Sequence, residues 1–294
     1  MERRNEQQVT ASDGRTLGVC QWGVPDGRTV FNLHGTPGSR LGRHYDPAVY
    51  ARAGVRVITY DRPGYGVSDR QLGRRVVDAA GDVATIADAL RIDRFAVMGG
   101  SGGGPHALAC AALLGERIES VAAVVCPAPW DAPGIDPLAG QSPGNLEEFG
   151  AALRGREALE ELLGGQAAGI ADDPWTIVTG RDDRLPPEDI ESLERPERFR
   201  VFAEALGEAV AQGAAGWVDD DLAFVQPWGF ELEDIAAPVS VWQGHRDSLI
   251  PAEHGRYLAA TIPRARIHWI ETGHLAIAEH IGEILADLTA TRTG

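Results

Sequence analysis

A serine set among glycines, Ser101 within Gly99–Gly103, is the strongest chemical signal in this sequence. It follows an apolar run at residues 95–98 and precedes a second apolar run that suits a buried helix. Small neighbours permit a sharp strand-to-helix turn that exposes the serine Oγ above a sheet edge, which predicts a nucleophile. Residues 102–107 also fit the dinucleotide-binding pattern G-x-G-x-x-A, but the next strand-like run, 121–125, is not followed by the acidic residue that this pattern requires.

Two further side chains have the type and chain order that an activated serine needs. Asp247 lies in a turn after the strand-like run 239–243, and His274 follows another such run at 266–270. The carboxyl ends of parallel strands share one edge of a sheet, so these residues can converge on Ser101. We expect His274 to take the Ser101 proton and return it to the leaving group, while Asp247 orients the imidazole and stabilises its charged form.

A tight turn at residues 34–38 follows the strand-like run 29–33 and can aim a backbone amide. The amides of Thr36 and Gly102 are therefore predicted to form an oxyanion hole, which stabilises charge developing on a carbonyl oxygen. His34, in the same turn, is interpreted as a structural histidine without a chemical role.

These residues need a sheet to position them, and strand-like runs alternate with helical patterns through much of the chain. This alternation indicates a parallel sheet. Apolar side chains at helical spacing mark two core-facing helices, one from Val76 to Leu90 and one from Ile277 to Leu288. The alternation breaks after residue 126, and helical stretches are expected near 146–163 and 187–210. We therefore predict a core of residues 1–126 and 236–294 with a helical lid at 127–235. The strand candidates are 16–22, 29–33, 55–60, 95–99, 121–126, 239–243 and 266–270.

At this point the chain resembles the α/β-hydrolase family, in its serine-nucleophile, esterase- or lipase-like branch. The resemblance rests on residues 34–38, Asp61–Ser68, Gly99–Gly103, Asp247 with Pro251, and Gly273-His274. It implies a mostly parallel eight-stranded sheet flanked by helices, with a lid inserted after the sixth strand. It also implies a triad of Ser101, Asp247 and His274, and oxyanion donors at Thr36 and Gly102. Some members of the family use an acid at the position of Asp131, but the turn and Pro251 favour Asp247.

The expected reaction is cofactor-free hydrolysis of a small or medium, mostly apolar carboxylic ester or lactone through an acyl-enzyme. Serine at position 101 excludes the aspartate-dependent haloalkane dehalogenases and epoxide hydrolases of this fold. Three alternatives remain: an aminopeptidase or amidase similar to the proline iminopeptidases, with lid carboxylates holding a substrate amine; a non-catalytic ligand-binding member; and perhydrolysis or carbon–carbon hydrolysis by the same triad.

The charge of −16 is concentrated in the lid, which holds 24 of the 43 acidic residues but only 7 of the 27 basic ones. These acids have two interpretations: solvated helix faces that keep the protein soluble, or a field that disfavours anionic substrates. Either one makes nucleic acid a poor partner. Large aromatic side chains in the lid are candidates to line a substrate pocket, and we expect some of the following to do so: Trp130, Trp175, Trp217, Trp228, Phe149, Phe202, Phe224 and Phe230.

Composition narrows the chemistry further. No apolar run reaches membrane-spanning length and the N-terminus lacks a signal-peptide pattern, so we expect a soluble, cytoplasmic protein with a small-molecule substrate. Cys20, Cys110 and Cys126 are interpreted as reduced core residues, and no metal-ligand spacing is found. The chain has no lysine, which excludes Schiff-base chemistry and a P-loop. A homodimer is one option for its oligomeric state.

Overall fold

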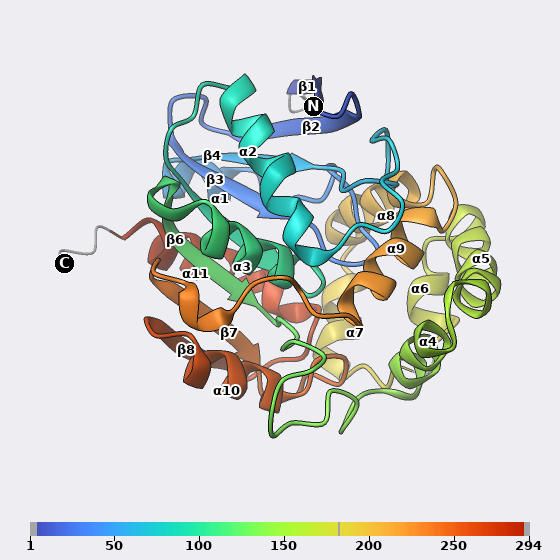
Figure 1. Cartoon of the computed structure of the whole chain (residues 1–294). Coiled ribbons are helices and arrows are strands. Elements are labelled where there is room, and N and C mark those ends of the chain that lie inside the picture. The colour runs from blue at the N-terminus through green and yellow to red at the C-terminus, as the bar shows by residue number, and fades with distance from the viewer. Residues whose placement is uncertain (1–4, 182, 291–294) are drawn as a thin grey trace.

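The computed structural model describes residues 5–181 and 183–290, and an eight-stranded sheet runs through its centre (Figure 1). In spatial order the strands are β1-β2-β4-β3-β5-β6-β7-β8. The β1–β2 and β2–β4 pairs are antiparallel, and every other neighbouring pair is parallel. This confirms the predicted α/β-hydrolase fold class. The strands are β1 (Asn5–Thr10), β2 (Thr16–Gly23), β3 (Arg28–Leu33), β4 (Val55–Tyr60), β5 (Phe95–Gly100), β6 (Ile118–Val124), β7 (Val239–Gly244) and β8 (Ala265–Ile270).

Seven of these strands coincide with strand candidates of the sequence, but β1 was not among them. Its sequence, NEQQVT, contains one apolar side chain of strand type, Val9, and that side chain is the buried one. The strand lies at the edge of the sheet and is held by antiparallel pairing with β2. An edge strand exposed to water needs little apolar surface, so hydropathy alone does not reveal it.

Helices cover both faces of the sheet because the strand side chains alternate between two apolar layers. On one face pack α2 (Ala79–Ala89), α3 (Gly103–Leu113) and α10 (Ala252–Thr261), and on the other lie α1 (Ala48–Ala53) and α11 (Ile281–Thr289). The predicted stripe through Val76, Val83 and Ala87 is buried, although α2 begins only at Ala79 and Val76 belongs to a preceding 3-10 turn. The 3-10 turns are η1 (Val76–Asp78), η2 (Gly115–Arg117), η3 (Leu232–Asp234) and η4 (Ala276–His280).

The segment between β6 and β7 is helical, and we call its residues 127–235 the insertion. Figure 1 shows its helices grouped at the side of the sheet toward which β3 and β6 point. The two expected helical stretches are each divided: Gly155, at φ 109°, separates α4 from α5, and Pro196 begins α8 after the short α7. The helices are α4 (Pro143–Arg154), α5 (Arg156–Asp172), α6 (Thr176–Thr179), α7 (Pro187–Leu193), α8 (Pro196–Ala209) and α9 (Ala215–Phe224).

Candidate active site

Ser101 occupies the turn between β5 and α3 in a left-handed conformation, with φ 53°. A non-glycine residue held there stores roughly 1–3 kcal/mol of strain, so its surroundings must impose the conformation. A Cβ on Gly99 would lie 2.1 Å from the Gly103 carbonyl oxygen, which shows how closely the turn is packed. The Ser101 amide also donates to the Val124 carbonyl at 2.9 Å. The turn therefore holds Ser101 at the carboxyl edge of the sheet, where it lines a cavity.

Asp247 and His274, from the loops after β7 and β8, are in contact. The Asp247 Oδ2 atom lies 2.8 Å from His274 Nδ1, and both side chains are buried. Asp247 Oδ1 accepts the amides of Leu249 and Ile250 at 2.9 and 2.8 Å, which fixes the carboxylate. Burial by itself would lower the pKa of His274, but the Asp247 carboxylate outweighs it, so this pKa lies above its ordinary value of 6.5.

Asp189, on α7, is a site residue that the sequence analysis missed. It is fully buried, and its carboxylate accepts the amides of His274, Leu275 and Ala276 at 2.9, 3.0 and 2.7 Å. These bonds tie the loop that carries His274 to the insertion. No local pattern marks Asp189, because it stands in an acidic helix and its partners lie about eighty residues away in the chain.

Ser101, His274, Thr36 and Gly102 all line one cavity, with Asp247 behind the histidine. Thr36 and Gly102 are neighbours, since a Cβ on Gly102 would lie 2.3 Å from Thr36 Oγ1. No hydrogen bond joins the Ser101 Oγ to another described residue, and such catalytic contacts often tighten only when substrate is bound.

The cavity has a volume of about 380 Å³ and is mainly apolar. Of the aromatic candidates named from the sequence, Trp175 and Phe230 are not in its lining, and the others are: Trp130, Trp217, Trp228, Phe149, Phe202 and Phe224. A second cavity, of about 310 Å³, adjoins the same Ser101 and His274 from the side of α1 and α11. Substrate groups on both sides of a reacting carbonyl thus have space.

The interpretation of the insertion's acids as solvated is wrong for six residues, of which Glu148, Asp183 and Asp221 line the cavity. Glu148, Asp183, Asp189, Asp219, Asp220 and Asp221 are all buried. Arg181 pairs with Glu148 and Asp183, and the Trp217 indole donates to Glu148 at 2.7 Å. Glu148 and Asp183 turn inward because these buried arginine and tryptophan partners are available to them.

Asp221 stands beside Glu148 in the cavity wall. Its Oδ2 atom is buried and has no hydrogen-bond partner among the described residues. Burial and the neighbouring Glu148 carboxylate both raise the pKa of Asp221 well above its usual range. Burial and the adjacent Glu148 carboxylate thus favour the protonated form of Asp221.

The remaining features expected from sequence are also located. Asp131 is exposed, and the contact to His274 is made by Asp247. Cys20, Cys110 and Cys126 are buried. Within residues 5–181 and 183–290, we find neither a group of three or more side chains arranged to hold a metal ion nor a helix long and apolar enough to cross a membrane.

Comparison with known proteins agrees with this architecture. Residues 28–149 match the family model described as alpha/beta hydrolase fold. The enol-lactonase from Burkholderia xenovorans LB400 superposes with a TM-score of 0.71 at 21% identity, over 96% of this chain and 99% of that one. The chain has the α/β-hydrolase fold.

Two relatives in sequence extend over most of the chain. One is the 2-hydroxy-6-oxononadienedioate/2-hydroxy-6-oxononatrienedioate hydrolase of Cupriavidus pinatubonensis, 27% identical over 92% of this chain and 90% of that protein. The other is the proline iminopeptidase of Neisseria gonorrhoeae, 25% identical over 90% of this chain and 88% of that protein. Together with the fold, these relatives support a hydrolase.

Proposed function

We propose that this protein is a serine hydrolase that cleaves a small or medium, mostly apolar carboxylic ester or lactone through an acyl-enzyme. The observation that carries the proposal is the strained Ser101 facing the same cavity as His274, whose Nδ1 is held 2.8 Å from Asp247. The apolar cavity wall supports a mostly apolar substrate. The enol-lactonase and the other hydrolases among the similar proteins agree with carbonyl chemistry.

The reaction follows from these positions. His274 Nε2 takes the Ser101 proton while Oγ bonds to the substrate carbonyl carbon, and the carbonyl oxygen gains charge facing the Thr36 and Gly102 amides. The C–O bond to the alcohol then breaks, and the imidazolium returns its proton to the departing oxygen. Water repeats the sequence on the acyl-enzyme, which releases the acid and restores Ser101.

The domain division belongs to the same proposal. Residues 1–126 and 236–294 form the hydrolase core, and the insertion acts as a lid that contributes much of the cavity wall. Its own apolar core, which includes Leu159, Leu163 and Trp217, supports treating it as a unit.

Intact-mass labelling with a fluorophosphonate tests the nucleophile. We expect one adduct on the wild type, none on Ser101→Ala, and strongly slowed labelling of His274→Ala and Asp247→Asn, together with Ser101-dependent turnover of short aryl esters. A folded wild type that forms no adduct and turns over no ester would refute the proposal and favour a non-catalytic ligand-binding protein.

A second candidate is an aminopeptidase or amidase that binds a substrate amine at Glu148 and Asp221. It is favoured by the position of this carboxyl pair in the cavity wall and by the similarity to the proline iminopeptidase. Glu148→Gln should then abolish turnover of amine-bearing substrates and spare simple esters. Its exposed neighbour on α4 provides the matched control, Glu147→Gln. Equal effects of both variants on both substrate types would exclude this candidate.

A further inference from the structure

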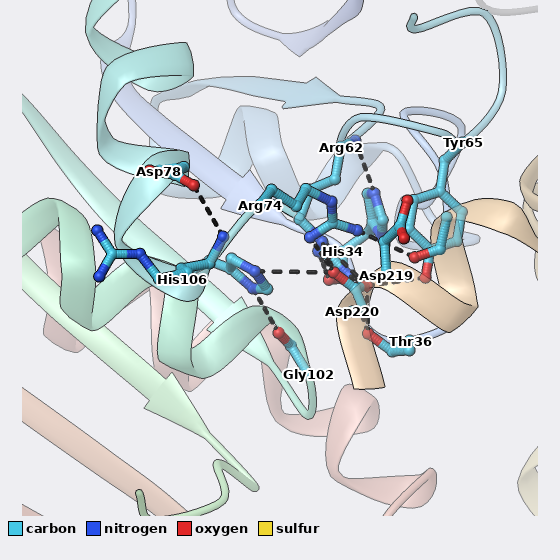
Figure 2. Close-up of polar contacts among 12 residues, drawn as sticks. His34, Thr36, Arg62, Tyr65, Arg74, Asp78, Gly102, His106, Asp219 and Asp220 are labelled. Atoms are coloured by element: carbon cyan, nitrogen blue, oxygen red, sulfur yellow. Dashed lines mark hydrogen bonds and ion pairs between the residues drawn. The ribbon is translucent and has the colours of Figure 1, made fainter. Parts of the chain in front are cut away.

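A buried charge network joins the insertion to the loop that carries Thr36, and Asp220 on α9 lies at its centre (Figure 2). Asp220 is fully buried. It accepts hydrogen bonds from the Thr36 hydroxyl at 2.7 Å and the Tyr65 hydroxyl at 2.8 Å, and its carboxylate lies 2.6 Å from both Arg62 Nη2 and Arg74 Nη1. One carboxylate of the insertion thus holds four side chains of the core.

The network also determines which way the Thr36 amide points. The Gly35 carbonyl oxygen lies 3.0 Å from Arg62 Nη2 and 2.7 Å from His34 Nδ1. His34 Nε2 accepts the Arg62 amide at 3.1 Å, which assigns the imidazole proton to Nδ1 and makes His34 a donor to Gly35. In a trans peptide the carbonyl and the following N–H point in opposite directions. Fixing the Gly35 carbonyl therefore turns the Thr36 N–H away from Arg62.

Asp220 holds both Arg62 and Thr36 in this network. Its carboxylate holds the Arg62 guanidinium, and the same guanidinium donates to Thr36 Oγ1 at 2.9 Å. Burial acts to raise the pKa of Asp220, but Arg62 and Arg74 outweigh burial, so the pKa lies well below its usual range and the group is ionised. Thr36 in turn touches Gly102, the second expected donor.

We propose that Asp220 is a positioning residue for the oxyanion hole, holding Arg62 and Thr36 so that the Thr36 amide faces the carbonyl oxygen above Ser101. This inference rests on the proposed function. The chemical step then requires α9 to be packed against the core, because the insertion supplies the carboxylate that holds the oxyanion loop.

A purely structural role for Asp220 would be to attach α9 to the core without orienting the oxyanion loop. The neighbouring Asp219 allows these two roles to be distinguished. Asp219 pairs with Arg70 at 2.7 Å and with Arg156 at 2.8 Å, and neither arginine belongs to the oxyanion loop. Arg70→Gln therefore weakens the attachment of the same helix without touching Thr36, which makes it the matched control.

The test compares kcat and KM for an aryl ester in folded variants. Thr36→Val removes the hydroxyl but keeps the branched shape and the backbone amide, whereas Thr36→Ser keeps the hydroxyl. We expect kcat to fall at least about tenfold in Thr36→Val and about a hundredfold in Asp220→Asn, as for a weakened or lost oxyanion donor, with KM changed less than about threefold. Thr36→Ser should lose less kcat than Thr36→Val, and Arg70→Gln should keep kcat close to the wild type.

Three results would overturn the inference. One is a wild-type kcat in folded Thr36→Val, which decides the matter even where Asp220→Asn does not fold. Another is a loss of kcat in Arg70→Gln equal to that in Asp220→Asn. The third is a change in KM alone, with kcat unaltered, in Thr36→Val and Asp220→Asn. In each case Ser101-dependent turnover by the wild type leaves the proposed function standing. A wild type without such turnover would instead overturn both.

Discussion

Replacing Asp247 with asparagine tests the catalytic role of the Asp247–His274 contact, and the structure dictates how the new side chain sits. Asp247 Oδ1 accepts two backbone amides, from Leu249 and Ile250. In Asp247→Asn only the amide oxygen can accept these bonds, so the NH₂ group must face His274 Nδ1. The imidazole then carries its proton on Nε2, where it cannot accept the Ser101 proton.

The expected loss is large because the base is placed in the wrong tautomer. An asparagine in the equivalent role of a serine protease lowers kcat about 10⁴-fold, which corresponds to roughly 5 kcal/mol at 1.36 kcal/mol per factor of ten. The pH profile should also move. His274 works as a base only when neutral, and its raised pKa means that wild-type activity falls as the pH drops through a value above 6.5. Loss of the Asp247 charge removes the cause of that shift, so the acidic limb should move to lower pH.

The assay is aryl-ester turnover from about pH 5 to pH 9 in both proteins, with folding checked by circular dichroism. Asp131→Asn serves as the control, because Asp131 is the exposed alternative acid. A folded Asp247→Asn protein with kcat within tenfold of the wild type would refute this reasoning, and a simultaneous loss in Asp131→Asn would transfer the role to Asp131.

Three further predictions concern stability. Asp220→Asn leaves two buried guanidinium groups without their carboxylate and should lower the free energy of unfolding, measured with urea, by about 3–5 kcal/mol. Glu253→Gln, in an exposed ion pair, should lower it by less than about 1 kcal/mol. Equal losses in the two variants would contradict this account. Gly99→Ala would place a Cβ 2.1 Å from a carbonyl oxygen and should lower the free energy of unfolding by about 1–3 kcal/mol or more. Gly100→Ala meets nothing within 4 Å and should leave the thermal midpoint nearly unchanged, so similar midpoints for the two glycine variants would count against the packing described for this turn. Asp221 has a raised pKa, so its contribution to stability is lost as the pH rises above the unfolded-state value of about 3.9. Asp221→Asn should therefore gain stability relative to the wild type from pH 4 to pH 8, and a constant difference across this range would contradict the shift.

Most of the fold could be predicted from the sequence because its signals are local. The parallel strands are buried on both faces and read as short apolar runs, as at 55–60, and turns rich in glycine mark their ends. Apolar patterning did not reveal the edge strand β1, because this strand buries only Val9. The long helical stretches are divided at Gly155 and Pro196 by backbone constraints that apolar periodicity does not report.

The residues of the candidate site likewise fall into those that the sequence reveals and those that it does not. Ser101, Asp247 and His274 stand in short motifs next to strand ends, so each could be named before its contacts were known. Asp189 and Asp220 could not, because their roles arise only when the insertion folds onto the core. In sequence they look like other acids of a charged segment.

The α/β class, the order of the elements and the residue types that can perform acyl transfer follow from local periodicity and from motifs within a few residues. Where the acidic residues of the insertion go depends instead on how the chain packs in three dimensions. A carboxylate exchanges water for the protein interior only when buried partners compensate for its lost hydration. For Asp220 those partners, Arg62 and Arg74, lie about 150 residues earlier in the chain, and the fold alone brings them together.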